Sequence, residues 1–337
     1  MRKALVFGAS GQMARALVPL LTDAGWQVDA VTRSGRVLPD AIAPFARHVP
    51  YAGSRAATIR ASNGYDAVFD PMALSPTDAD DLCAAADDVG QFCVISTASV
   101  YADAKGRSLE TVAATGFPRF PRMILETQQT VPAGEGYSAG KVAMEQVLSG
   151  KRATILRPGA IHGIGARHPR EWWFVKRVLD GRRDVPLIDA GQNVFQTSSA
   201  AVIASLAAFC LIGGHLGTYN AADSQSLTVA QIGTAIALAM NSSFNLIAVD
   251  DLPDALSHIG FTPWSVEHPM RLSTAKARAL GWDGGPDYTS QLPAYCAWMA
   301  RHHQSWIADF PAFQAYGHDP FDYIGEDIAL RQAVRLP

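Results

Sequence analysis

The opening residues form a glycine turn that limits the fold more than any other feature of the sequence. The apolar run Ala4 to Phe7 meets Gly8 at once, and the pattern Gly8-x-x-Gly11-x-x-Ala14 leads into a helix-like stretch. Val28 to Val31 is a second apolar run, so the segment predicts strand, helix, strand. Such turns bring the helix N-terminus and its free N–H groups to the pyrophosphate of a dinucleotide. We expect the cofactor to contact Gly8, Ser10, Gly11, Gln12 and Met13.

Further short apolar runs alternate with helix-like stretches. The runs are 66–69, 92–95, 153–156 and 218–221, and the helix-like stretches include 78–89, 138–148 and 172–179. This alternation predicts an α/β fold with a Rossmann doubly wound parallel sheet and a smaller, mostly C-terminal substrate lobe. We expect the Rossmann domain at residues 1–160, with a returning strand near 190–235. The substrate-binding lobe would comprise 161–189 and 236–337.

The composition excludes several classes of function. The 337 residues are 48% hydrophobic and carry a net charge of −3, which argues against a nucleic acid or an anionic membrane as a partner. No apolar run reaches the length of a membrane span, and the first apolar run is too short for a signal peptide. The four cysteines are scattered without metal-ligand spacing. We therefore expect a cytoplasmic protein with reduced thiols and no metal site.

The end of the second apolar run bears on the choice of coenzyme. NAD sites usually place an acidic residue there for the ribose hydroxyls, whereas an arginine can accept the 2′-phosphate of NADP. The sequence reads Val31-Thr32-Arg33, and Asp29 lies within the predicted strand. This favours NADP(H), with NAD(H) as the alternative. In the other interpretation Arg33 is an ordinary surface residue.

Tyr137 and Lys141 are four residues apart, a spacing that places both side chains on one face of a helix. A nearby ammonium would lower the pKa of the phenol and prepare it for proton transfer. The pattern alone also fits an exposed pair with no function. The run 92–95 ends in Ser96-Thr97-Ala98-Ser99-Val100-Tyr101, where parallel sheets bind their ligands.

Taken together, these motifs resemble the extended short-chain dehydrogenases/reductases, the NAD-dependent epimerase/dehydratase family that acts largely on nucleotide sugars. The resemblance rests on Gly8 to Ala14, Thr97 to Tyr101, Tyr137 to Lys141 and Arg157-Pro158-Gly159, in the family's order. Tyr219-Asn220-Ala221 also resembles its last Rossmann strand, so the match covers about the first 220 residues.

The resemblance implies roles for particular residues. Tyr137 would be the acid/base, Thr97 would hydrogen-bond the substrate oxygen, and Lys141 would also bind the nicotinamide ribose. Ser96 and Ser99 are the alternatives to Thr97. The other cofactor contacts implied are Met72 and Ala73 on the adenine side and Pro158 and Gly159 near the nicotinamide, and the substrate candidates are Ser99, His162 and Arg167. A homodimer through helices 78–89 and 138–148 is implied as well.

The sequence also departs from the family pattern. The dehydratases carry Asp-Glu after the catalytic threonine, whereas this chain has Ala98-Ser99, so dehydration of a sugar is not expected. An acidic residue that contacts adenine in many members is replaced in Gly53-Ser54-Arg55. Six basic residues between 167 and 183 would either clamp a diphosphate or form a solvated helix face.

The sequence is compatible with three functions. The leading one is a net NADP(H)-dependent reductase or dehydrogenase acting on a hydroxyl/carbonyl pair of a small molecule, with a nucleotide sugar as the candidate substrate. The second is a nucleotide-sugar epimerase with retained NAD. The third is a non-catalytic relative that senses cofactor or binds RNA, against which the intact Tyr137 and Lys141 argue.

Overall fold

The computed structural model describes residues 1–32 and 37–333, and it divides into two compact units. Unit 1 comprises Met1–Ile161, Ser198–Ser224 and Leu272–Gly285. Unit 2 comprises His162–Thr197, Gln225–Arg271 and Pro286–Pro337. Arg33, on which the coenzyme prediction rests, lies outside the described residues.

Unit 1 is built on a parallel sheet, which confirms the predicted Rossmann fold. Among the described residues the sheet has seven strands in the order β10-β6-β5-β4-β1-β2-β3, and each neighbouring pair is parallel. The order reverses at β1, as in doubly wound sheets. The strands are β1 Lys3–Val6, β2 Gln27–Val31, β3 Arg47–Val49, β4 Ala67–Asp70, β5 Phe92–Ile95, β6 Ala153–Pro158 and β10 Gly217–Ala221.

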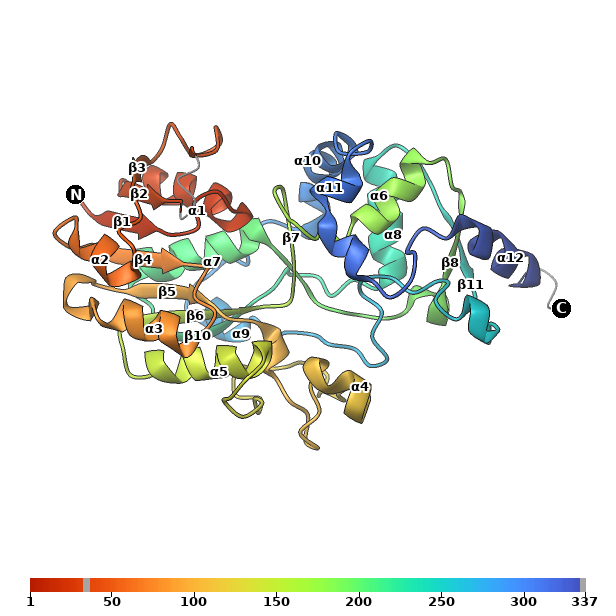
Figure 1. Cartoon of the computed structure of the whole chain (residues 1–337), viewed down its shortest axis with the longest axis horizontal. Coiled ribbons are helices and arrows are strands. Elements are labelled where there is room, and N and C mark those ends of the chain that lie inside the picture. Colours follow the sequence, from red (N-terminus) through yellow and green to blue (C-terminus); the bar gives the residue numbers. More distant parts are fainter. Residues whose placement is uncertain (33–36, 334–337) are drawn as a thin grey trace. The chain divides into compact units, whose positions relative to one another are not determined.

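Helices cover both faces of this sheet (Figure 1). Ala4 and Val6 of β1 join the core beneath α1 and α7, while Leu5 joins the core on the opposite face, beneath α2, α3 and α5. Both faces of the central strands are therefore buried, which explains their continuous apolar sequence. The helices of unit 1 are α1 Gln12–Asp23, α2 Arg55–Arg60, α3 Pro76–Cys83, α4 Val112–Thr115, α5 Tyr137–Leu148, α7 Ala200–Gly213 and α9 Ala275–Ala279.

Some elements differ from the sequence prediction. The helix expected at 78–89 is the shorter α3, which starts at Pro76 because Ser75 and Asp78 form a capping box. A separate 3₁₀ turn, Ala86–Asp88, follows it. The edge strand β3 and the helix α2 were not predicted from the sequence, since both are short and carry charged residues.

Unit 2 is mostly helical, and many of its buried side chains are aromatic. Its helix α6, predicted at 172–179, buries Trp172, Trp173 and Phe174 almost completely. The parallel pair β8 and β11 forms a small sheet. The elements are α6 Trp172–Leu179, β8 Asp184–Leu187, α8 Val229–Ala239, β11 Asn245–Ala248, α10 Tyr288–Ala300, α11 Trp306–Asp309 and α12 Tyr323–Ala333. The short strands β7 Ala160–His162 and β9 Thr197–Ser199 pair with each other.

The basic cluster of residues 167–183 is largely occupied by partners within unit 2. Arg177 is 1% exposed, pairs with Glu326 of α12 and lies over the ring of Trp173. Arg182 pairs with Asp327 at 2.5 Å, and Lys176 pairs with Asp180. A solvated helix face is therefore the wrong interpretation for Arg177, which joins the last helix to the core. Arg167 is exposed.

Within the described residues, none of the helices has the length and apolar character that crossing a bilayer requires.

Candidate active site

The glycine turn closes the first strand of unit 1 and begins α1. Gly8 has a positive φ of 64°, and an added Cβ would lie 2.9 Å from the Cγ of Met72. The Gly11 amide donates to the Gly8 carbonyl at 2.9 Å. Gly11 is the N-cap of α1, so no side chain caps this helix, and its first turn carries no acidic residue. The first amides of α1 therefore remain available to an anion.

Two more observations fit a dinucleotide at this turn. Ala14 is fully buried and lets α1 pack closely on the core. The amide oxygen of Gln12 is buried and has no hydrogen-bond partner in the structure. A buried polar atom without a partner is costly, and a bound ligand would supply one. Ser10 is exposed beside it, and Met13 is partly buried.

Met72 and Ala73 follow β4 and are held by a buried ion-pair cluster. Asp70, at the end of β4, accepts from the Met72 amide at 2.7 Å and from Arg55 Nε at 2.5 Å. Arg55 also donates to the Met72 carbonyl at 3.0 Å and to Asp78 of α3 at 2.7 Å. Arg55 thus joins α2, β4 and α3 behind the predicted adenine side. Of the predicted pair, Met72 lies against Gly8 of the turn, whereas the Ala73 carbonyl accepts from Lys141.

Thr97 lies just beyond β5 and caps a 3₁₀ turn, Ala98–Val100, by accepting from the Ser99 amide at 3.2 Å. Its hydroxyl also lies 3.1 Å from that of Ser99. Ser96, the other alternative, points elsewhere: its hydroxyl donates to Glu145 of α5 at 2.5 Å. The geometry therefore favours Thr97 and Ser99 over Ser96 as groups that can face a substrate.

Tyr137 is the first residue of α5, the helix that also carries Lys141. The tyrosine is 55% exposed. Partial burial raises the pKa of Tyr137 above its ordinary value, and the neighbouring Thr97 hydroxyl opposes that rise. The sequence predicted a lowered pKa, so the direction is the reverse of the expectation.

The position of Lys141 explains why the pKa of Tyr137 is raised rather than lowered. Its ammonium donates to the carbonyl oxygens of Ala73 at 2.7 Å and Ile95 at 2.6 Å, beyond the ends of β4 and β5. The side chain is 2% exposed, and burial lowers the pKa of Lys141 to about 8, against the opposing charges of Asp70, Asp78 and Glu145. An ammonium has three donors, so one remains for a ligand. Lys141 therefore lies at the sheet edge, but its ammonium binds backbone carbonyls rather than the Tyr137 phenol.

A carboxylate that was not predicted holds the start of α5. The N-cap is Gly136, which has no side chain, and the Glu110 carboxylate accepts from the amides of Tyr137 at 2.9 Å and Ser138 at 2.8 Å. These bonds lower the pKa of Glu110, with those from Ser138 the largest cause. Glu110 is 27 residues upstream, so no local spacing in the sequence could have indicated this cap.

Pro158 is the last residue of β6 and is buried, and Gly159 follows it. The Gly159 amide donates to Ser198 at 2.8 Å, and Arg157 pairs with Glu145 at 2.5 Å. Both members of this pair are buried. Glu145 was not predicted, although its spacing of four residues from Lys141 on α5 was a usable signal.

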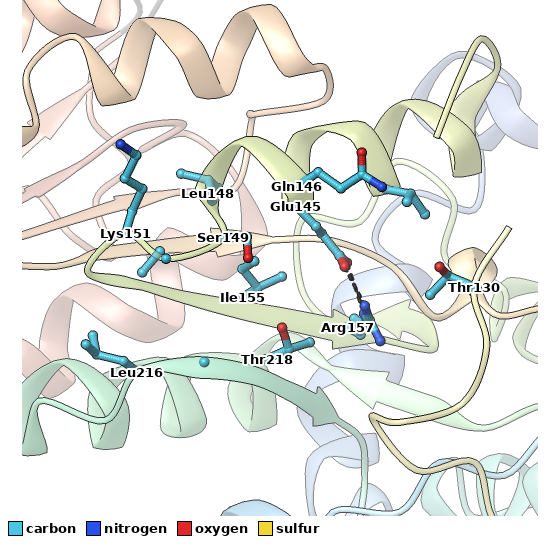
Figure 2. A pocket seen from close by; sticks show the side chains of 14 residues that line it. Thr130, Glu145, Gln146, Leu148, Ser149, Lys151, Ile155, Arg157, Leu216 and Thr218 are labelled. Carbon is cyan, nitrogen blue, oxygen red and sulfur yellow. Dashed lines mark hydrogen bonds and ion pairs between the residues drawn. The ribbon is translucent and has the colours of Figure 1, made fainter. Parts of the chain in front are cut away.

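The Glu145–Arg157 pair also forms a wall of a pocket of about 500 Å³ between α5, β6 and β10 (Figure 2). None of the predicted site residues lines it.

The other predicted substrate contacts, His162 and Arg167, lie in unit 2. His162 is buried in unit 2 beside Glu171 and Tyr288, whereas Arg167 is exposed. In the described part of the chain, no group of histidine, cysteine and acidic residues could hold a metal ion.

Comparisons with known proteins support the same fold. Residues 41–179 match the NAD-binding family model described as male sterility protein. None of the curated proteins matches the chain.

The solved structures with this fold include three relatives at low sequence identity. The UDP-N-acetylglucosamine 4-epimerase of Bacillus cereus is 16% identical with a TM-score of 0.66, covering 89% of this chain and 99% of that chain. The UDP-glucose 4-epimerase of Thermus thermophilus in complex with NAD is 18% identical with a TM-score of 0.62, covering 88% and 99%. The dTDP-glucose 4,6-dehydratase of Bacillus anthracis in complex with NAD is 13% identical with a TM-score of 0.63, covering 92% and 100%. These matches confirm the predicted resemblance at the level of the fold.

Proposed function

We propose that this chain, which has the fold of the extended short-chain dehydrogenase/reductase family, is a nicotinamide-dependent oxidoreductase acting on a hydroxyl/carbonyl pair. The observation that carries the proposal is the position of Lys141, whose ammonium contacts the carbonyls at the ends of β4 and β5. Tyr137 begins the same helix, and the Thr97 hydroxyl that follows β5 acts to lower the pKa of the phenol. Parallel sheets of this kind bind ligands at the edge where these strands end.

The residues divide the chemistry between them. The bound nicotinamide would supply or accept the hydride at the substrate carbon. Tyr137 would give the proton to the substrate oxygen, or take it, while Thr97 holds that oxygen by a hydrogen bond. Lys141 would donate its third N–H to the nicotinamide ribose. Its positive charge would stabilise the phenolate once a ligand draws it from the carbonyls.

The coenzyme that we propose is NADP(H). Asp29, the acidic residue nearest the end of β2, is fully buried and is bound by Arg47 at 2.7 Å and by Tyr65 at 2.8 Å. The Asp29 carboxylate is therefore occupied by partners within the protein. At the strand end Thr32 is bonded to His48 at 3.0 Å, and the sequence continues with Arg33. Neither residue favours the unphosphorylated ribose as an acid would.

The substrate that we propose is a small carbonyl or hydroxyl compound of the nucleotide-sugar class. The structures with this fold include complexes with UDP-N-acetylmuramic acid, UDP-glucuronic acid and UDP-glucose. An epimerase with retained NAD is the second candidate, since two of the relatives above are 4-epimerases. A cytoplasmic location and a homodimer through α3 and α5 remain proposals that accompany this reading.

The first experiment identifies the coenzyme. The purified protein is denatured and the released nucleotide is identified and counted by mass spectrometry. We expect little or none, and the emptied protein should then bind NADPH at least tenfold more tightly than NADH in a fluorescence titration. One tightly held NAD(H) per chain would instead support the epimerase. A protein that binds neither coenzyme would disprove both proposals.

A further inference from the structure

Two buried polar atoms on α1 have no hydrogen-bond partner in the described part of the chain. One is the Nε donor of Arg15, and the other is the Oε1 acceptor of Gln12. Both residues are partly exposed, and Arg15 forms no ion pair with any carboxylate that the structure describes. A buried donor or acceptor without a partner is destabilising, so a ligand that supplies the partner should bind here.

Arg15 lies on the side of α1 that faces the connection between β2 and β3. Residues seven apart in a helix lie two turns apart on one face, so Arg15 shares its face with Thr22. The Thr22 hydroxyl donates to the Phe45 carbonyl of that connection at 3.2 Å. Leu38 and Ile42 of the same connection join the core beneath α1. Because α1 begins at the sheet edge where β2 ends, Arg15 lies near the end of β2.

The coenzyme groups expected at the end of β2 match the two unpartnered atoms. In Rossmann folds the adenosine ribose lies at the end of the second strand. In NADP(H) this ribose carries a 2′-phosphate, which accepts hydrogen bonds from a guanidinium, and a 3′-hydroxyl, which can donate to an amide oxygen. The ribose of NAD(H) offers hydroxyls but no anion. The phosphorylated ribose is therefore the better match, because it supplies an anionic acceptor for Arg15 as well as a donor for Gln12.

We propose that Arg15 binds the 2′-phosphate of NADP(H) and thereby selects the phosphorylated coenzyme, while Gln12 accepts from a hydroxyl of the same ribose. The inference rests on the proposed oxidoreductase function, and it adds a residue that determines coenzyme specificity. Arg15 follows directly after Ala14, the last position of the glycine pattern. The pattern describes the turn and the first contact of α1, so it does not mark the side chain that comes next.

The coenzyme pyrophosphate is the other anion expected at the start of α1. Its place is at the first amides of the helix, which no side chain caps and no acidic residue of the first turn neutralises. Arg15 is one turn beyond the N-cap Gly11, on the side of the β2–β3 connection. Asp29 is bound by Arg47 at 2.7 Å and by Tyr65 at 2.8 Å, so this acid does not compete with a phosphate for Arg15.

The test compares coenzymes that differ only in the 2′-phosphate. NADPH and NADH are titrated by nicotinamide fluorescence into the unmodified protein, Arg15→Met and Arg15→Lys. Methionine keeps an apolar stem at this position and removes the guanidinium. Arg122→Met is the matched control, because Arg122 is an exposed arginine of the same unit and its loss changes the net charge equally. Thermal unfolding without coenzyme is followed in parallel.

We expect Arg15→Met to weaken NADPH binding about tenfold or more and to leave NADH binding within about twofold, because a charge-assisted hydrogen bond to a phosphate is lost. Arg15→Lys should lose less, since it keeps the charge. The melting temperature without coenzyme should not change, because Arg15 has no partner in the described protein. Equal weakening of NADPH and NADH, with or without a lower melting temperature, would overturn the proposal. Unchanged binding of both coenzymes would overturn it as well.

A second measurement separates the phosphates directly. In ³¹P NMR spectra of bound NADP⁺ the 2′-phosphate and the pyrophosphate give separate signals. A neighbouring guanidinium favours the dianion of the 2′-phosphate, so we expect Arg15→Met to raise the pKa of this group by about half a pH unit relative to Arg122→Met. A change confined to the pyrophosphate signals would place Arg15 at the pyrophosphate and overturn the proposal.

The same titrations separate this inference from the proposed function. An unmodified protein that binds NADH more tightly than NADPH would overturn the role of Arg15 and leave the oxidoreductase function standing. If the protein binds neither coenzyme, the oxidoreductase function fails, and calorimetric titration with 2′,5′-ADP and 5′-AMP decides on Arg15. A preference for 2′,5′-ADP that Arg15→Met abolishes would support the phosphate contact, and the absence of such a preference would overturn it.

Discussion

At the scale of single residues, Lys141 gives the clearest pH dependence. Burial lowers its pKa from the ordinary 10.5 to about 8. Between these pH values the unfolded chain binds more protons at this position than the folded chain, so the contribution of Lys141 to the free energy of unfolding rises with pH. We expect Lys141→Met to lose this rise. The stability of the unmodified protein relative to the variant should therefore increase by on the order of 1–3 kcal/mol from pH 8 to pH 10.

Urea unfolding at several pH values measures this difference. Lys105→Met, an exposed lysine of the same unit, is the control and should run parallel to the unmodified protein. If the free energy of unfolding of Lys141→Met shows the same pH dependence as that of the unmodified protein, Lys141 is not desolvated in the folded chain and its pKa is ordinary.

The residues predicted from the sequence are those that sit in fixed local patterns. Thr97, Tyr137 and the glycines could be proposed because their spacing is set by a strand end, a helix turn and a βα turn. Glu110 could not, because it reaches α5 from 27 residues upstream and its bonds go to backbone amides, which any residue type offers. The direction of the Tyr137 pKa was missed for a related reason, since spacing places Lys141 on the right helix face but does not say which acceptors hold its ammonium.

At the scale of elements, the βα turn makes a sharp prediction through Gly8. An alanine there would have to keep a φ of 64° and place its Cβ 2.9 Å from Met72. We expect Gly8→Ala to destabilise unit 1 by about 1–3 kcal/mol and to weaken coenzyme binding, because the turn must shift. Gly25→Ala is the matched control: its φ is 80°, but no atom lies within 4 Å of the added Cβ. Calorimetric titration with NADPH separates the two, and equal affinities would show that the close approach to Met72 does not matter.

The elements that sequence reasoning found are the ones with a buried face. Strands β4, β5 and β6 are buried on both sides and read as continuous apolar runs. By contrast, β3 presents Arg47 and His48, because it is the outer strand of the sheet and only Val49 is partly buried. Its place is set by pairing with β2 and by the Arg47–Asp29 bond, neither of which leaves a periodic signal.

At the scale of the whole molecule, the two units draw on distant parts of the chain. Leu272–Gly285 belongs to unit 1, where Ala277 and Trp282 join the core beneath α1 and α7. The sequence pattern placed this segment with the C-terminal lobe, because a short helix and one tryptophan fit either core. The last helix, α12, is bound into unit 2 by a buried ion pair, and the prediction below follows from that anchor.

Removing one partner of the Arg177–Glu326 pair should destabilise unit 2 selectively. Both side chains are at least 96% buried, so Glu326→Ala leaves an unpaired guanidinium in the core, which costs about 3–5 kcal/mol. Tryptophan fluorescence reports on this unit, since five of the seven tryptophans (172, 173, 264, 298 and 306) belong to it. In urea we expect an early fluorescence transition for Glu326→Ala, while NADPH binding by unit 1 is lost only at higher urea. Glu267→Ala, whose side chain is 57% exposed in the same unit, should unfold like the unmodified protein. A single transition shared by fluorescence and coenzyme binding would show instead that the two units unfold together and that α12 stabilises the whole molecule.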